Sequence, residues 1–396
     1  MKRYWTLAAV LAASPAAAQT VTVEAGANAQ ERLQAALIEA KPGSIVRIGA
    51  GRFELTDGLS LDVDRVTVRG AGPDKTVLSF KGQLGAGEGL LVTSDDVVLR
   101  GFAVEDSKGD GIKSKGADRI LYKDIRVEWT GGPKATNGAY GVYPVESSDV
   151  LIDRVTVKGA SDAGIYVGQS DRIIVRNSTA MYNVAGIEIE NSGHADVTGN
   201  LVTHNTGGIL VFDLPALPRR GAGWVTVSGN KVVDNDTPNF APKGNIVATV
   251  PTGTGVLIMA ANNVTVTGNE LAGHGTANIM VIAYRQPFDD KGYNPLPRHV
   301  HLAANKHGHA GFAPAMPGGA ELAKALGGTL PPIFWDGTGG DAVDLTGDNQ
   351  VPMLSLGLAL GAGIETAKPQ PVKLSEKIPP PPGIVKLPPA MEAAAK

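Results

Sequence analysis

Branched apolar residues alternate with polar residues in short segments along most of the chain, which is the pattern of a half-buried β-strand. Several segments begin with glycine, such as GIYVGQS from Gly164 and GIEIENS from Gly186. Between Gly89 and Gly255 the glycines that open them lie 22, 30, 23, 22, 22 and 47 residues apart. A spacing of 47 residues is about two repeats, and a spacing of 30 is one repeat with a loop. The pattern therefore predicts a repeat of about 22 residues.

A second alternating strand follows the first at a constant offset, as in RIIVRN from Arg172 and NVTVTGN from Asn263. Two or three short strands per repeat fit one coil of a solenoid, whose coils stack at the ~4.8 Å spacing of hydrogen-bonded strands. The connections are too short for crossover helices, and the signature of a leucine-rich repeat is absent. The sequence predicts an all-β fold, a right-handed single-stranded parallel β-helix with an N-terminal capping helix.

Asparagines recur after the second strand of the repeat, where each side-chain amide could bond the coils above and below it. We expect them to form a structural ladder. The residues concerned are Asn177, Asn200, Asn230, Asn269 and Asn305.

The two ends of the chain depart from the repeat. Lys2 and Arg3, an apolar stretch and three small residues predict a signal peptide cut after Ala18. The mature protein is therefore expected in the periplasm or outside the cell. The predicted regions are the signal peptide at 1–18, an N-terminal strand and capping helix at 19–43, the parallel β-helix at 44–311, an irregular C-terminal region at 312–367 and a Pro-rich tail at 368–396.

The composition excludes several kinds of site. The chain has no cysteine, which rules out disulfides, thiolate metal sites and cysteine nucleophiles. The net charge is -3 and no basic block occurs, which argues against nucleic acid as the main partner. No later apolar run reaches the length of a membrane span.

The segment PGSIVRIGAGRFEL after the predicted helix resembles the start of many bacterial pectate-lyase-like β-helices. The run from Val127 to Pro215, with NGAYGVYPVESS, GASDAGIYVGQS, NVAGIEIENS and NTGGILVFDLP, resembles a family of exported bacterial parallel β-helix repeat proteins. That family is related in architecture to NosD and to carbohydrate-processing β-helix proteins. The resemblance covers most of residues 20–310 and implies fold and export. The wider superfamily contains lyases, C5-epimerases, hydrolases and non-enzymes, so it does not fix a reaction.

Outward-facing residues of successive first strands should form columns on one sheet. One column reads Lys113, Tyr143, Tyr166, Glu188, Leu210, Leu257 and Met280. The next reads Lys115, Val145, Gly168, Glu190, Phe212, Met259 and Ile282. A polar zone therefore lies beside an apolar one, and we expect loops or the C-terminal segment to cover the apolar rows.

The polar zone suits elimination or C5-epimerisation of a uronate, which needs a carboxylate neutraliser, a base and an acid. Lys113 is the candidate neutraliser, Tyr143 or Tyr166 the candidate base or acid, and Glu188 or Glu190 the candidate base. Hydrolysis by the two glutamates is a weaker option, since both point the same way from one strand. The tyrosines could instead be an aromatic stack that stabilises the sheet, with solvated charges around it.

Further polar residues at strand ends and in loops are candidates for substrate binding. Arg219 and Arg220 could clamp a carboxylate, and a row of Asp and Asn side chains could hold Ca²⁺. The predicted substrate-binding residues are Lys115, Asp162, Gln169, Asn191, Asp213, Arg219 and Arg220.

Two His-x-His pairs offer a rival function. His299 and His301 alternate on one strand, and His307 and His309 follow closely. Imidazole pairs could bind Cu²⁺ or Zn²⁺, and the resemblance to NosD-like proteins implies copper handling. We expect an exported β-helix that binds an acidic polysaccharide, with lyase or C5-epimerase activity. Non-catalytic carbohydrate binding and a metal-handling role of His299 and His301 are the alternatives.

Overall fold

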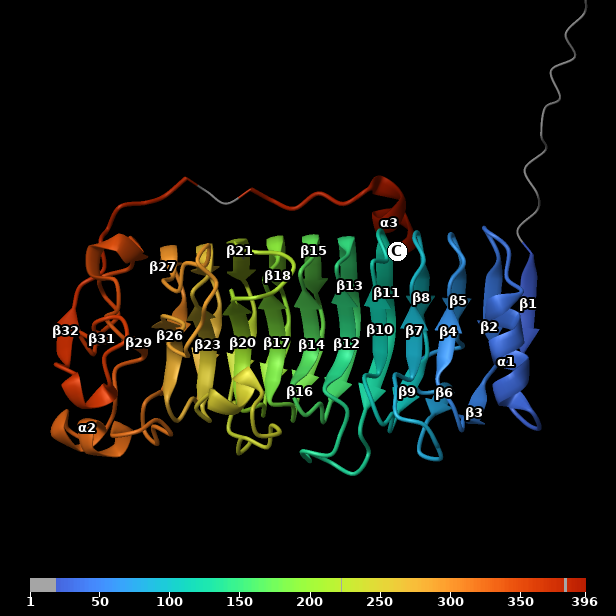
Figure 1. Ribbon diagram of the computed structural model, residues 1–396, viewed down its shortest axis with the longest axis horizontal. Helices are drawn as coiled ribbons and strands as arrows, with labels where there is room; N and C mark the ends of the chain where they lie inside the picture. The colour runs from blue at the N-terminus through green and yellow to red at the C-terminus, as the bar shows by residue number, and fades with distance from the viewer. Residues whose placement is uncertain (1–18, 222, 381–382) are drawn as a thin grey trace, which may run out of the picture.

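The computed structural model describes residues 19–221, 223–380 and 383–396. The predicted signal peptide lies outside these residues. Figure 1 shows parallel strands stacked coil upon coil along one long axis, from the N-terminal strands at one end to the C-terminal strands at the other. Two sheets, of 20 and 12 strands, run the length of the stack.

The 12-stranded sheet carries one strand from each coil. All its neighbours pair in parallel except the last two. Its strands are β4 (Leu59–Leu61), β7 (Leu90–Val92), β10 (Ile112–Lys115), β12 (Tyr140–Val145), β14 (Ala163–Gly168), β17 (Ala185–Glu190), β20 (Gly207–Phe212), β23 (Thr254–Met259), β26 (Ala277–Ile282), β29 (Ile333–Trp335), β31 (Met353–Ser355) and β32 (Gln370–Val372).

The 20-stranded sheet has two runs of strands that meet at a corner of each coil. The first run holds β1 (Thr20–Val23), β2 (Ile45–Ile48), β5 (Thr67–Arg69), β8 (Val98–Arg100), β15 (Asp171–Arg176), β18 (Gly193–Thr198), β21 (Gly223–Ser228), β24 (Asn262–Thr267), β27 (Arg298–Ala303) and β30 (Leu345–Gly347). The second run holds β3 (Gly51–Glu54), β6 (Thr76–Ser79), β9 (Ala103–Glu105), β16 (Thr179–Met181), β19 (Leu201–Thr203), β22 (Lys231–Val233), β25 (Glu270–Ala272) and β28 (Lys306–His307). The long strands β11 (Ile120–Glu128) and β13 (Ser148–Lys158) pass through the corner and belong to both runs.

The core is built from branched apolar side chains stacked in register. Ile165, Ile187 and Ile209 lie directly above one another on the 12-stranded sheet and are fully buried. Small and branched side chains suit this interior because each coil buries them against the coil above and below. The inward phase predicted from the sequence is therefore confirmed.

The asparagine ladder forms in four of its five predicted rungs. Asn200, Asn230 and Asn269 each donate from Nδ2 to the Oδ1 of the next asparagine at 2.9 Å, ending at Asn305. The prediction was wrong for Asn177. This residue occupies the corner between β15 and β16, where its φ of 52° suits asparagine, and Ser178 takes the ladder position instead.

The helix predicted near the N-terminus forms as α1 (Ala29–Ile38), with Leu33 and Leu37 in the core. Its role as a cap stays a prediction. Of the helices in the described ranges, none is long and apolar enough to cross a membrane.

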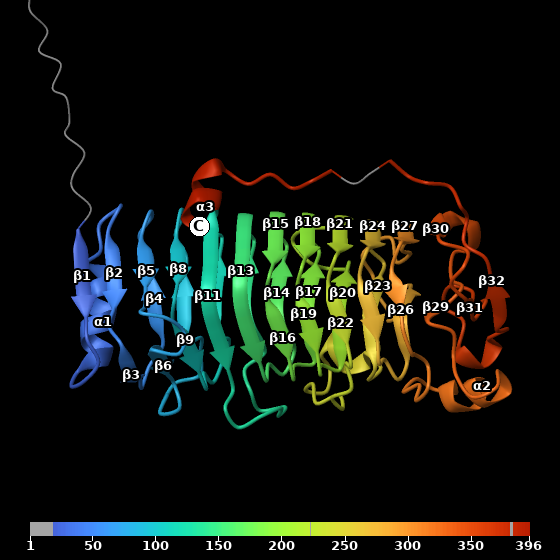
Figure 2. The same cartoon turned by 180° about the vertical axis from the view of Figure 1, so that it is seen from behind.

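Residues 312–367, predicted to be irregular, contain β29, β30 and β31, which continue both sheets. They also hold the short helices α2 (Gly319–Ala325), η2 (Gly340–Val343) and η3 (Ile364–Thr366). The Pro-rich tail then runs back along the solenoid and ends in α3 (Pro389–Ala394), which Figures 1 and 2 both place at the level of β8 and β11.

The tail is anchored by an apolar cluster on the 20-stranded sheet. Leu387 and Met391 pack with Leu121, Leu151 and Ile174, and Glu392 pairs with Arg176 at 3.0 Å. The end of the tail therefore covers the 20-stranded sheet and not the 12-stranded sheet.

Replacing Met391 by alanine should undock this helix. Losing the buried thioether costs about 2 kcal/mol, which raises the undocked fraction roughly 30-fold. Tryptic cleavage after the exposed Lys386 should accelerate by a similar factor. Ile384→Ala, at an exposed position of the same segment, is the control. Equal cleavage rates in the two variants would show that α3 is not held by this cluster.

Candidate functional site

The predicted polar columns exist on the 12-stranded sheet. Lys113 lies opposite Tyr143, and Tyr166 lies opposite Glu188, which is followed by Leu210 on the next coil. The zone is not uniformly open. Tyr166, Glu188 and Glu190 are 4%, 1% and 7% exposed, whereas the Lys113 side chain is 25% exposed.

Three tyrosine rings form a tight cluster on this sheet. The centroid of Tyr140 lies 4.5 Å from that of Tyr143 and 4.4 Å from that of Tyr166, and Tyr143 meets Tyr166 edge-on at 4.9 Å. Edge-on and tilted packing of this kind is favourable. The predicted aromatic stack is therefore present, and it has a third member.

Tyr166 reaches across the sheet to a carboxylate of the next coil. Its hydroxyl donates to Glu190 Oε1 at 2.5 Å, and the Gln169 amide donates to the same hydroxyl at 3.3 Å. The ring can lie this way because its own strand has glycine two residues on. A Cβ at Gly168 would overlap the ring of Tyr166.

Four carboxyl groups around the tyrosines hold their protons more tightly than usual. Burial raises the pKa of Asp162 to about 7, and burial also raises the pKa of Glu190 to about 7 against the opposing hydrogen bond from Tyr166. Burial, with the nearby charges of Asp162 and Glu190, raises the pKa of Glu188 well above its ordinary value. Desolvation raises the pKa of Asp110 to about 6, with Lys113 opposing it. Such a group of perturbed carboxyls is typical of acid–base sites.

These shifts predict a pH-dependent stability. A carboxyl whose pKa is raised on folding binds more protons in the native state, so the free energy of unfolding falls as pH rises. We expect a decrease of roughly 2–5 kcal/mol between about pH 5 and pH 8.

The matched variant is Asp162→Asn, whose amide oxygen can still accept the 2.9 Å hydrogen bond from Asn245. Denaturant unfolding at several pH values should give it a shallower slope than the wild type. A wild-type stability that increases across this pH range would contradict the assignment.

Loops cover the apolar rows beside this site, as expected from the sequence. The segment 236–253 includes η1 (Ile246–Thr249) and packs Val247 and Val250 onto the apolar outward residues. Tyr293, from the segment 284–298, donates to the backbone oxygen of Asp213 at 2.6 Å. Among the described residues of the tail at 368–396, none belongs to this apolar cluster.

The open end of the site surrounds Lys113. Its Nζ lies 3.1 Å from a Glu88 oxygen, 3.8 Å from an Asp110 oxygen and 4.9 Å from the centre of the Tyr143 ring. Lys115 lies farther out and pairs with Glu146 at 3.9 Å. A cation and a carboxyl with a raised pKa thus stand together at the exposed edge.

The remaining predicted binding residues hold loops. Asn191 donates to the backbone oxygens of Leu214 and Arg219, and Gly221 N–H donates to Asp213 Oδ1 at 3.2 Å. Arg219 pairs with Asp171 at 2.8 Å, and Arg220 with Asp290 at 3.0 Å. The structure therefore gathers them around the loop 213–223 and not around Lys113. Within the described ranges no three His, Asp or Glu side chains are grouped as metal ligands.

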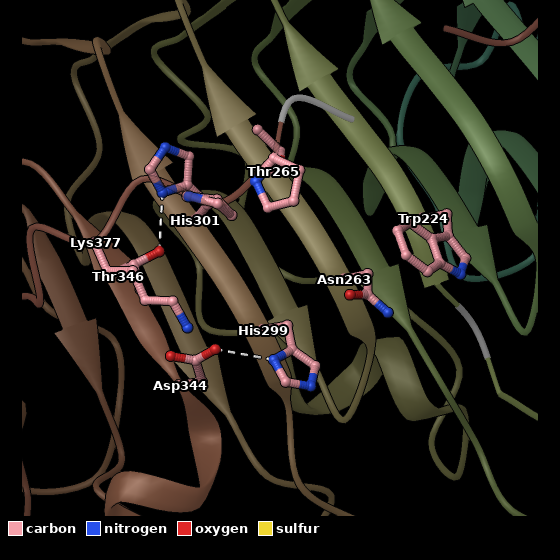
Figure 3. A pocket seen from close by; sticks show the side chains of 10 residues that line it. Trp224, Asn263, Thr265, His299, His301, Asp344, Thr346 and Lys377 are labelled. Carbon is pink, nitrogen blue, oxygen red and sulfur yellow. Dashed lines mark hydrogen bonds and ion pairs between the residues drawn. The ribbon is translucent and has the colours of Figure 1, made fainter. Parts of the chain in front are cut away.

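His299 and His301 lie in a different place, in a pocket of about 280 Å³ beneath the C-terminal tail. Figure 3 shows His299 turned towards Asp344 and His301 towards Thr346, with Trp224 on the opposite side. The Nδ1 contacts are 3.0 Å for His299 and 2.9 Å for His301. His309 stacks on Phe312 instead, so it does not share the contacts of His299.

Comparison with known proteins agrees with the β-helix fold. A family model described as a right-handed beta helix region matches residues 61–217. This part of the chain is a right-handed β-helix.

Solved structures with the same β-helix fold include the A-modules of two mannuronan C-5 epimerases from Azotobacter vinelandii. AlgE4 is 13% identical, with a TM-score of 0.52 over 86% of this chain and 97% of its own. AlgE6 is 14% identical, with a TM-score of 0.50 over 79% of this chain and 87% of its own. A search of curated protein sequences finds no match. At such identities the likeness shows the fold alone.

Within this β-helix, sequence reasoning missed Tyr140, Asp110 and Glu88. Tyr140 begins its strand, where alternation does not yet fix the direction of a side chain. Asp110 and Glu88 lie just before strands, at turn positions that read as ordinary turn formers. The spacing of Asp110, three residues before Lys113, was the one available signal.

Proposed function

We propose that the chain is an exported β-helix that acts on an acidic polysaccharide, removing the C5 proton of a uronate as a lyase or C5-epimerase. The observation that carries this proposal is the hydrogen bond between Tyr166 and Glu190, inside a cluster of tyrosines and of carboxyls with raised pKa values. The export part rests on the N-terminal sequence.

The groups divide into roles by their proton affinities. Glu190, with a pKa of about 7, is the base for the C5 proton. Burial raises the pKa of Tyr143 to about 12, so this phenol stays protonated and acts as the acid. Lys113, which lies beside Glu88 and Asp110, neutralises the substrate carboxylate, whose charge grows as C5–H breaks. The electron pair from C5–H either expels the C4 oxygen, giving the unsaturated product, or takes a proton back on the opposite face.

Access to the base requires movement of its cover. Glu190 is 7% exposed, and the Asn245–Asp162 hydrogen bond ties the loop 236–253 to the same cluster. A polymer that reaches Glu190 therefore has to displace part of the cover, as loop-gated enzymes do.

The β-helix fold supports the proposal of a polysaccharide substrate. The A-modules of the two mannuronan C-5 epimerases share the β-helix fold, and mannuronan is a uronate polymer. A β-helix that binds the polymer without changing it is the alternative, in which the tyrosines serve only as a binding platform.

Incubation with a panel of uronate polymers tests the proposal. Ultraviolet absorbance detects the unsaturated product of a lyase, and proton NMR detects a changed uronate composition. Glu146→Gln, at an exposed glutamate outside the cluster, is the control for activity. Unchanged polymers across the panel, with binding retained, would favour the non-catalytic alternative.

A further inference from the structure

A column of cations runs along the N-terminal part of the 20-stranded sheet, on a different face from the tyrosine cluster. Arg47 lies opposite Arg69, Arg69 opposite Arg100, and Arg100 opposite Lys123, on four successive coils. Neighbouring members are therefore separated by about one strand spacing, ~4.8 Å. Like charges directly opposite each other destabilise a sheet unless something neutralises them.

The first two members of the column are unneutralised. Arg47 and Arg69 are exposed, and among the described residues neither guanidinium group has a hydrogen bond or an ion pair. Arg100 donates once, to the neutral backbone oxygen of Ala394 at 3.2 Å. The positive charges of Arg47, Arg69 and Arg100 are thus available to a ligand.

The column lies along a groove. One concavity of about 480 Å³ is lined by Arg69 and Arg100, and a second of about 280 Å³ is lined by Arg47 and Arg69. The two share Arg69 and the backbone of Gly70, so they are adjoining parts of one groove.

The other arginines of the groove are already paired with carboxylates, and an exposed aspartate offers hydrogen-bond acceptors. Arg154 pairs with Asp124 at 2.7 Å, and Arg126 pairs with Glu105 at 2.9 Å. Asp74 is 92% exposed in its side chain. Acceptors of this kind can bind hydroxyl groups beside the arginines.

Lys123, the last member of the column, shows which kind of group binds there. Lys123 donates to the backbone oxygen of Ala395. Asp153 takes the next position and ends the column, and Arg176, one coil farther on, pairs with both Asp153 and the Glu392 carboxylate. Glu392 lies in α3 and Ala395 directly follows it. Figure 2 places α3 over β11, next to the open strands β5 and β8. The C-terminal end of this helix thus occupies the Lys123 end of the column.

We propose that the open part of the column, Arg47, Arg69 and Arg100, binds the carboxylates of an acidic polysaccharide, as a docking surface separate from the tyrosine cluster. The identity of the polymer rests on the proposed function. Arginine pairs with carboxylates in a bidentate way, and a stack of arginines at a regular spacing suits a chain that carries a carboxylate on every sugar. The hydroxyl groups of the sugars can donate to Asp74 and Asp124, which line the groove beside the arginines.

The test is binding of mannuronan oligosaccharides to the full chain, measured by calorimetry at low salt. Arg47→Gln/Arg69→Gln should weaken binding on the order of tenfold and reduce its salt dependence. Lys231→Gln/Lys306→Gln removes the same charge from exposed positions of the second run and should bind as the wild type does. Thermal unfolding and circular dichroism check that both variants fold.

Equal affinities in the arginine variant and the wild type would overturn the docking surface, and so would equal weakening in the lysine variant. Tighter binding of duplex DNA than of mannuronan, lost in the arginine variant, would also overturn it. Turnover of a short oligosaccharide separates this inference from the proposed function. If the arginine variant loses binding while no uronate is ever turned over, the docking surface stands and the catalytic proposal fails.

Discussion

Replacing Glu190 by glutamine should lower turnover of a uronate polymer by about 100-fold or more, because the base for the C5 proton is lost. The amide can still accept the hydrogen bond that Tyr166 donates at 2.5 Å, so the site should keep its shape. The same change removes a buried carboxyl with a raised pKa. We therefore expect the variant to be at least as stable as the wild type at neutral pH, which separates loss of catalysis from loss of folding.

A second variant assigns the acid. Tyr143→Phe should reduce elimination by a similar factor while leaving the Tyr166–Glu190 contact in place. Michaelis kinetics should show the loss in kcat, since both groups act on the reacting atoms. Glu146→Gln, outside the cluster, should change kcat less than twofold. If Glu190→Gln and Tyr143→Phe retain wild-type kcat, the reaction takes place elsewhere.

The largest effect on stability is expected in the asparagine ladder. Asn230 is 2% exposed; its Oδ1 accepts from both the N–H and the side chain of Asn200, and its Nδ2 donates to Asn269. Asn230→Ala leaves these buried groups unsatisfied, which should cost roughly 3–5 kcal/mol in the free energy of unfolding. Denaturant unfolding provides the measurement.

Asn177 supplies the control, since it lies at an exposed corner outside the ladder. Asn177→Gly removes its side chain while glycine accepts the φ of 52°, and it should cost less than about 1 kcal/mol. Equal losses at Asn230 and Asn177 would mean that the ladder does not stabilise the stack.

The stacked columns could be predicted because they follow from two local rules, alternation within a strand and a constant repeat length. These rules place Lys113, Tyr143 and Glu188 on one sheet without knowledge of any contact between coils. They fail at corners and strand ends. Asn177 lies one residue before the ladder position, and Tyr140 begins its strand, so neither obeys the period.

Burial of the site could not be predicted in the same way. Glu188 is covered because other parts of the chain pack over its sheet, and Asn245, which ties one such loop to the site, lies 83 residues from its partner Asp162. Alternation says that a side chain points outward, but not whether a loop then encloses it. The raised pKa of Glu188 follows from that enclosure.

The cation column was missed for a related reason. Arg47, Arg69 and Arg100 lie at or near the ends of three different short strands, and they are 22 and 31 residues apart in sequence. No local block of basic residues marks them. Only stacking in register brings them together.

The central claim is that this β-helix removes the C5 proton of a uronate at Glu190. The most direct measurement is NMR of mannuronan incubated with the protein in D₂O. We predict either deuterium at C5 of the recovered polymer or an unsaturated C4–C5 product, with both lost in Glu190→Gln and retained in Glu146→Gln. Deuterium or unsaturated product that persists undiminished in Glu190→Gln, or the absence of both from the wild type with every polymer it binds, would contradict the claim.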